Sequence, residues 1–458
     1  MLPHRSLWQL SQKHGPIMLF HLGSVPALLI SSGNMAREIL KTHDHVFCTR
    51  PVLEGFRKHL YDFKDVALAP YGEYWRQMRK TSVLELLSTK RVQSFQSVRV
   101  QEVEHMINSI SVKASCVVNL TEKLNNLIHT IIQRIVLGVS YEGKKTDYGG
   151  NFAELIHGAI SLMAASTVVS YTPYIGGIIA LFTGLQTKLE KNFNELDKLL
   201  QQAIDEHSDP ERQTQEHKDI VDVLLRVESD QLGEIGFRKD HIKAILMDMY
   251  LDATETTTET LVWAMPELAK NPRVMKKVQD EVRRCVGKKK KVDGKDLDQL
   301  HYLTMVMKEV LRLHPPGAIL LPRECMSHCN IYGYDIYPKT WVIVNVWTIG
   351  RDPDSWKDPE VFFPERFIDC LIDFRGQDFD FLPFGAGRRG CPGISMGTAI
   401  MELALANLIY CFNWELPLGL KIEDLEMDET GIFVIKKKSA LRLVPIKYDW
   451  GSSKENFF

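Results

Sequence analysis

The sequence has no run of about 18 or more apolar residues, the length that a membrane-spanning helix requires, although 45% of its 458 residues are hydrophobic. It has no charge excess either, since 56 Lys and Arg residues stand against 58 Asp and Glu. Nothing in this charge suggests nucleic-acid binding. Internal repeats and low-complexity segments are also absent. The composition is therefore that of a globular chain that can bury a large core. Its length alone suggests more than one domain.

Paired cysteine spacings of the C-x-x-C kind are missing, although the chain contains eight cysteines. Such unpaired cysteines are typical of a reducing compartment. Cys325 and Cys329, with His328 between them, look faintly like a metal cluster but lack a second pair of ligands. We interpret them as structural.

One cysteine stands in a different setting. Residues 384–393 read FGAGRRGCPG and place Cys391 on a glycine-rich turn before an apolar segment, 394–410, that we expect to be helical. Unpaired N–H groups at a helix start favour a thiolate, so we expect a lowered cysteine pKa there, with Arg389 as a cation beside the sulfur. A lone thiolate is a poor zinc or iron–sulfur site. One thiolate suffices where a macrocycle already supplies four nitrogens to the metal, so this cysteine favours haem. The alternative interpretation is that Cys391 is a buried, inert core cysteine.

This segment resembles the signature of the haem-thiolate monooxygenases, the cytochromes P450. The positions at the family's spacing are Phe384, Gly387, Arg389, Cys391 and Gly393. The resemblance runs from residue 1 to about 447 and implies a mainly α fold with small β-sheets. It also implies one haem-enclosing catalytic domain over residues 1–458, with haem b (iron protoporphyrin IX) held by Cys391, and Phe384, Gly387, Arg389 and Gly393 among the cofactor-binding residues.

Two further motifs agree with the family. Glu309 and Arg312 are three residues apart, on one helix face, and with Arg366 they match a Glu-Arg-Arg triad that holds the segment before the cysteine loop. Trp75 and Arg79 match the pattern W-x-x-x-R. The resemblance implies that Trp75, Arg79, Arg323 and Arg389 reach the haem propionates, since buried carboxylates need cationic partners.

Residues 237–270 are expected to form one long helix that crosses the whole domain. Within it, Glu255 and Thr256 match the acid–alcohol pair that delivers protons for cleavage of the O–O bond. We therefore predict a catalytic role for both.

Asp252 departs from the family pattern, which has a small residue at this position. Three accounts remain open. The carboxylate is satisfied by threonine hydroxyls and water, or it pairs with a cationic substrate such as an alkaloid amine. Alternatively it attaches to the haem edge, as a glutamate does here in the fatty-acid hydroxylase branch.

The predicted substrate pocket is apolar. Matching positions place residues 317–321, Ile432 and Phe433 over the haem, with the loop 53–70 as its roof. Such a lining suits small lipophilic substrates.

Residues 71–80 (YGEYWRQMRK), Ala386 and residues 313–316 (LHPP) resemble the plant microsomal A-type branch. This implies a monooxygenase that inserts one oxygen atom from O2 into a small lipophilic plant metabolite: a terpenoid, an alkaloid or a phenylpropanoid. Electrons would come from NADPH through NADPH–cytochrome P450 reductase. The candidate contacts for this partner are Arg76, Lys80 and Arg388.

The resemblance further implies the cytosolic face of the endoplasmic reticulum membrane. The family's anchor and proline-rich hinge are not in these residues, which begin partway into its first helix. We expect a shortened chain, an incomplete gene model or a peripherally held member. Two other functions remain open: a reductase-independent haem-thiolate isomerase or dehydratase, and a haem-binding protein without turnover. The Glu255–Thr256 pair favours monooxygenation.

Overall fold

The computed structural model describes residues 2–138, 148–171, 182–212, 218–230 and 236–450. The helices are α1 (Pro3–His14), α2 (Gly33–Arg37), α3 (Asp44–Phe47), α4 (Glu73–Thr81), α5 (Thr89–Ser94), α6 (Gln96–Ser111), α7 (Leu120–Leu137), α8 (Tyr148–Tyr171), α10 (Leu185–Ser208), α11 (Ile220–Ser229), α12 (Lys239–Lys270), α13 (Pro272–Val286), α14 (His301–Leu313), α15 (Val346–Ile349) and α16 (Ile394–Cys411). The strands are β1 (Ile17–Leu22), β2 (Val25–Ile30), β3 (Val118–Asn119), β4 (Arg323–Glu324), β5 (Cys329–Ile331), β6 (Tyr334–Ile336), β7 (Trp341–Val344), β8 (Phe412–Glu415), β9 (Glu429–Thr430), β10 (Lys436–Lys437) and β11 (Arg442–Lys447). The predicted mainly α class with small sheets is confirmed.

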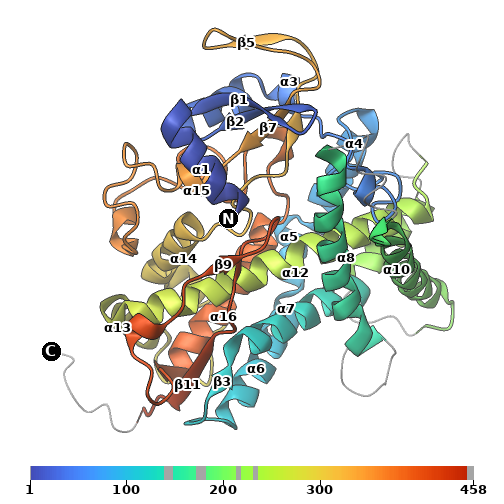
Figure 1. Cartoon of the computed structure of the whole chain (residues 1–458). Coiled ribbons are helices and arrows are strands. Elements are labelled where there is room, and N and C mark those ends of the chain that lie inside the picture. The colour runs from blue at the N-terminus through green and yellow to red at the C-terminus, as the bar shows by residue number, and fades with distance from the viewer. Residues whose placement is uncertain (1, 139–147, 172–181, 213–217, 231–235, 451–458) are drawn as a thin grey trace.

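The largest sheet joins the two halves of the chain. Its strand order is β1-β2-β7-β4. β1 and β2 form a hairpin, with Ile17 paired to Ile30 in antiparallel register. β2 then pairs in parallel with β7, Ile30 opposite Val344, and β7 pairs with β4, which carries Arg323. This sheet lies at one end of the molecule, above the helices (Figure 1).

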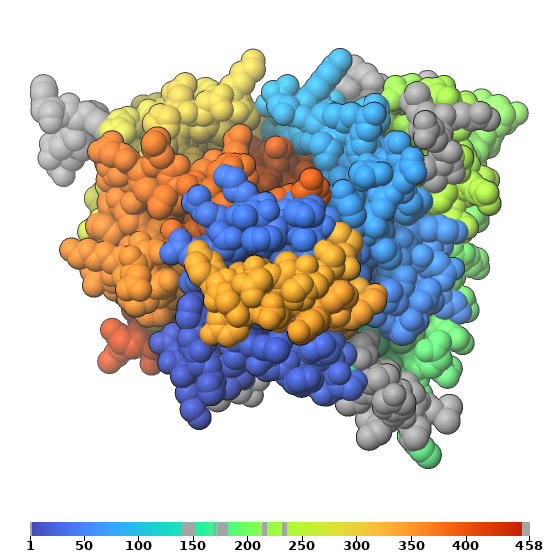
Figure 2. Space-filling view, turned by 90° about the horizontal axis from the view of Figure 1, so that it is seen from above, coloured from blue at the N-terminus to red at the C-terminus, as the bar shows by residue number. Residues whose placement is uncertain are grey.

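The β5–β6 hairpin lies at the surface beside that sheet, and Figure 2 shows it in gold between N-terminal segments in blue. Beneath it, Cys325 is 1% exposed and belongs to a core cluster with Ile331 and Ile336. This placement agrees with the structural role predicted for the cysteine.

The long helix predicted at 237–270 is confirmed as α12, which spans Lys239–Lys270 and continues through Pro266. It crosses the middle of the molecule (Figure 1) and packs against α7 and α16. The break that we expect at residues 171–177 falls almost wholly outside the described residues.

Among the described residues, α16 alone has the length and apolar composition that would allow a helix to cross a membrane. Most of it is buried against α6, α12 and α13. It therefore serves as a core helix here, and its first turn follows the cysteine loop.

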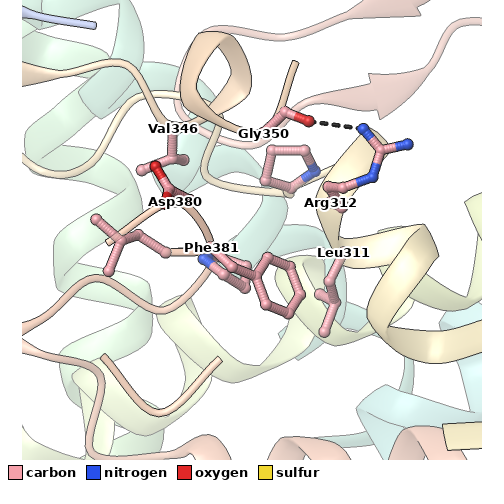
Figure 3. Close-up of a pocket in the computed structure, with 9 residues that line it drawn as sticks. Leu311, Arg312, Val346, Gly350, Asp380 and Phe381 are labelled. Atoms are coloured by element: carbon pink, nitrogen blue, oxygen red, sulfur yellow. Dashed lines mark hydrogen bonds between the residues drawn. The ribbon is translucent and has the colours of Figure 1, made fainter. Parts of the chain in front are cut away.

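A buried ionic lock fixes the segment before the cysteine loop. Glu309 accepts two hydrogen bonds of 2.8 Å from Arg312, and neither side chain is exposed. Arg366 donates to the same carboxylate at 3.0 Å, so the predicted triad comes together. The two arginines also donate to backbone carbonyls between residues 350 and 361; the bond from Arg312 to Gly350 O is 2.6 Å (Figure 3).

A small crevice adjoins this lock (Figure 3). It contains none of the residues predicted for the site; its lining is Leu311, Arg312, Pro315, Val346, Gly350, Asp380, Phe381, Leu382 and Pro383. We assign it no role.

We predict that Glu309→Gln lowers stability by about 3–5 kcal/mol, because it leaves the buried Arg312 charge without its anion. The thermal unfolding midpoint and the haem content of the purified protein measure this loss. Asp280→Asn is the matched control, since Asp280 belongs to an exposed pair with Lys276 at 3.4 Å and such pairs contribute little. Equal midpoints for the two variants would contradict the lock.

Candidate functional site

The cysteine loop depends on a close approach of backbones. Gly387 has φ +68°, and a Cβ there would lie 2.3 Å from Leu40 O and 2.7 Å from an Asp44 carboxylate oxygen. The Asp44 carboxylate is fully used: it accepts from Arg323 at 2.7 Å and from the backbone and side chain of Arg388 at 3.1 and 2.8 Å. The loop closes with a bond of 2.9 Å from Cys391 N to Phe384 O.

One face of α12 lines an interior space. Between residues 241 and 268 of this helix, only positions 248, 249, 252, 253 and 256 keep accessible surface. Their spacing of one, four, five and eight places them on a single face. Cys391 likewise has accessible surface, yet strong desolvation acts on it and on Asp252. Groups that are accessible but desolvated face an enclosed space, which we call the central cavity and define by Asp252, Thr256 and Cys391.

The expected low pKa of Cys391 is wrong for the protein alone. Burial, with a smaller effect of Asp252, raises the pKa of this thiol to about 11, although the Gly393 N–H and Arg79 act to lower it. Desolvation of the thiolate outweighs the helix terminus here. A bound metal ion would reverse this balance, because a coordinated thiol is deprotonated outright.

The cation that acts on the sulfur is Arg79, where we had expected Arg389. Arg79 donates to Gly390 O, in the cysteine loop, at 2.6 Å. Arg389 instead stacks over the Trp75 ring at 4.0 Å and donates to Cys48 O and Ala69 O. The loop directs Arg389 away from the sulfur because its chain must cross toward α4.

The arginines predicted to meet propionates do gather near one another. Burial lowers the pKa of Arg323 and of Arg79, and that of Arg389 to about 9. Like-charge repulsion from Arg323 and Arg79 further lowers the pKa of Arg389. The Trp75 indole donates to Val66 O at 2.9 Å.

A fourth arginine, Arg50, belongs to this cluster and was missed from the sequence. It is buried and donates to Ala67 O at 3.1 Å, Leu321 O at 2.5 Å and Pro322 O at 3.0 Å. Its position in a loop before Pro51 gives no sequence signal.

Two aspartates near the cavity were missed as well. Burial raises the pKa of Asp65 to about 6 and that of Asp248 well above its ordinary value. Asp248 accepts from Val66 N at 2.6 Å. The helical repeat was an available signal for Asp248, since it stands four residues before Asp252.

Asp252 and Thr256 share the cavity face of α12. The Thr256 hydroxyl donates to Asp252 O at 2.6 Å. Burial, and then the carboxylate of Asp65, raise the pKa of Asp252 to about 7, while Arg50 lowers it.

Glu255 points elsewhere than predicted. Its carboxylate contacts His157 of α8 at 2.8 Å and Lys436 of β10 at 2.5 Å. Burial alone would raise the pKa of Glu255, but its contacts with His157 and Lys436 hold this pKa below its ordinary value. No hydrogen bond between the Glu255 carboxylate and the Thr256 hydroxyl occurs among the described contacts, because residues one apart face different sides of a helix.

Some of the segments predicted to line the substrate pocket lie close to one another. The Phe56 ring lies edge-on to Phe433 with centroids 5.6 Å apart, so the roof segment reaches the late turn. Leu320 lies against the cysteine loop, 3.5 Å from the place of a Cβ on Gly385. Ile432 is half exposed.

These residues fit a haem. Among the described residues, Cys391 belongs to no group of three or more metal-ligating side chains, so a metal ion bound there would take most of its ligands from a macrocycle. Its two carboxylates would relieve the repulsion within the arginine cluster. One other group has the geometry of a metal site, His207, Asp219 and Asp222. There Arg212 already donates to both carboxylates, at 3.1 and 2.6 Å, so we assign it no metal.

Comparison with known proteins agrees with the resemblance. Residues 1–443 match the family model described as Cytochrome P450. The chain is 46% identical to "Cytochrome P450 71B35" of Arabidopsis thaliana over 97% of this chain and 89% of that protein. It is 47% identical to "Cytochrome P450 71A1" of Persea americana, with the same coverage of 97% and 89%. Its fold matches a zebra fish cytochrome P450 solved with abiraterone at a TM-score of 0.83, with 24% identity, over 97% of this chain and 99% of that one.

We predict that Gly387→Ala lowers the unfolding midpoint and the haem content more than Gly419→Ala. Both glycines have positive φ, of +68° and +88°, but nothing lies within 4 Å of a Cβ on Gly419. The two variants therefore share the backbone cost of about 1 kcal/mol, and their difference isolates the clash with Leu40 and Asp44. Indistinguishable variants would mean that the loop tolerates a side chain here.

Proposed function

The chain belongs to the cytochrome P450 family, in its plant A-type branch, and on that premise we propose that Cys391 holds the haem iron of a monooxygenase acting on a small lipophilic plant metabolite. The observation that carries this proposal is the desolvated Cys391 thiol, in the loop before α16, on which Asp252 of the accessible α12 face acts. Haem, when bound, would supply the activation of O2. The chain's own residues would bind the haem, orient the substrate and deliver protons to the cavity.

The cofactor's carboxylates are assigned to the arginine cluster. Arg79, Arg323 and Arg389, with Trp75 stacked on the last, would hold the propionates. Phe384, Gly387 and Gly393 shape the loop that presents the sulfur. The buried guanidiniums support this role, because each lacks bulk solvent and suits a bidentate carboxylate.

Proton supply is assigned to Glu255 and Thr256. Glu255 is linked to His157, whose side chain is 62% exposed, and this contact offers a route from solvent. Thr256, the next residue, faces the cavity. Its hydroxyl proton is engaged by Asp252 O, so it must rotate before it can donate toward the cavity.

Electrons would come from NADPH and reach the haem through a separate reductase. Arg76 and Lys80 are exposed on α4, the helix that carries Trp75, whereas Arg388 is held by Asp44. We place the protein at the cytosolic face of the endoplasmic reticulum membrane. Exposed apolar side chains at the N-terminal end, Trp8, Leu10 and Leu19, support contact with a lipid surface.

The absorption spectrum of the carbon monoxide complex of the dithionite-reduced protein tests whether Cys391 is the ligand of the haem iron. We expect a long-wavelength Soret band for the wild type and for Cys411→Ala, a control at the far end of the same helix. Cys391→Ala should lack this band, and Cys391→His should bind haem but give the short-wavelength band of nitrogen ligation. A long-wavelength band in Cys391→Ala would overturn the proposal.

Turnover tests the reaction class. The protein is reconstituted with reductase and with the metabolite, from a panel, that gives the largest spectral shift. In Thr256→Ala, product formation should fall by about 10²-fold, while NADPH is still consumed and the O2 is released as peroxide. Thr254→Ala is the control, because it removes an equivalent bond, from Thr254 to Tyr250 O at 2.8 Å, on a buried face. Product formed without reductase would favour the isomerase or dehydratase, and haem-loaded protein without any turnover would favour the binding protein.

A further inference from the structure

The carboxylate of Asp252 is open to the central cavity. In the part of the chain that the structure describes, no hydrogen bond or ion pair reaches it. Asp248, one turn earlier on the same face, makes a useful contrast because it accepts the Val66 N–H at 2.6 Å. The helix thus presents two inward carboxylates, of which one is satisfied by the protein and one is not.

The nearest cation does not supply the missing partner. Arg50 acts on Asp252 through space, but its guanidinium is committed to three backbone carbonyls, those of Ala67, Leu321 and Pro322. The other charged groups that act on Asp252 or respond to it, Asp65, Asp248 and Cys391, are acidic. An unpaired carboxylate in a desolvated space is strongly disfavoured. A ligand that carries a cation would supply the partner that the described residues do not.

We propose that Asp252 binds a cationic nitrogen of the substrate, so that the protein acts on lipophilic amines. This inference rests on the proposed function, since it places the substrate in the same cavity as the haem. A charge-assisted contact to Asp252 would anchor the nitrogen on α12. Apolar residues such as Phe56 and Phe433 would take the carbon skeleton. The anchor fixes which carbon faces the sulfur side of the cavity, so Asp252 sets both substrate class and regiochemistry.

Matched probes separate charge from shape. Each pair joins a phenylalkyl-trimethylammonium ion with its tert-butyl carbon isostere, in three chain lengths. A quaternary nitrogen cannot ligate iron, so the change in Soret absorbance reports cavity binding. In the haem-loaded wild type we expect at least one cation to bind about tenfold more tightly than its isostere, equivalent to about 1.4 kcal/mol.

Variants assign this preference to Asp252. In Asp252→Asn, which keeps size and removes charge, the preference should vanish while the affinity for the isostere changes less than about threefold. Asp252→Glu should retain it. A wild type that prefers none of the three cations overturns the inference, and so does a preference that survives in Asp252→Asn.

Two further measurements distinguish a failure of this inference from a failure of the proposed function. A normal carbon monoxide band without charge preference would remove only the amine assignment, whereas a missing band in the wild type would remove the haem-thiolate site itself. Haem that resists acid–acetone extraction from the wild type, but not from Asp252→Asn, would assign Asp252 to a covalent haem link and overturn the inference.

Discussion

The structure depends on the burial of charged and ionisable groups around Cys391. Because the interior is desolvated, the thiol of the protein alone has a pKa of about 11, and the surrounding arginines are pushed toward lower pKa values. Each charge in that region needs an opposite charge or a carbonyl. Asp44 is paired with Arg323 and Arg388, and Arg50 is held by three carbonyls. The cofactor's iron and carboxylates complete this set, which explains why a lone thiol, an arginine cluster and an apolar helix lie together.

The frame that keeps this space closed is built from contacts between distant parts of the chain. β2 pairs with β7 across more than 300 residues, from Ile30 to Val344, and β4 brings Arg323 to the same sheet. The Glu309 lock holds the carbonyl-rich segment that leads to the cysteine loop. Gly387 lets that loop approach Leu40 and Asp44. Contacts within the chain therefore position the loop, as a preorganised site requires.

Two of the carboxylates of α12, Glu255 and Asp252, show how neighbouring residues acquire different roles. Glu255 lies on the side of His157 and Lys436, which keep it ionised. Asp252 lies on the cavity side, without a partner among the described residues. Because residues three apart lie near the same helix face, the spacing alone does not separate these two roles; the partners that α8 and β10 offer to Glu255 do. Glu255 suits proton supply and Asp252 suits recognition of a cation.

The sequence alone determined the family, the fold class and the identity of the sulfur, because the motif around Cys391 and the long apolar repeat of α12 are local patterns. It also brought out the Glu309 triad and the unusual Asp252. Only the tertiary structure decided which cation faces the sulfur, that Glu255 turns toward His157, and that Arg50 and Asp65 join the site. These outcomes depend on desolvation and on contacts between residues hundreds of positions apart. No local pattern carries that information, since the same arginine or aspartate in a loop is equally compatible with a solvated surface.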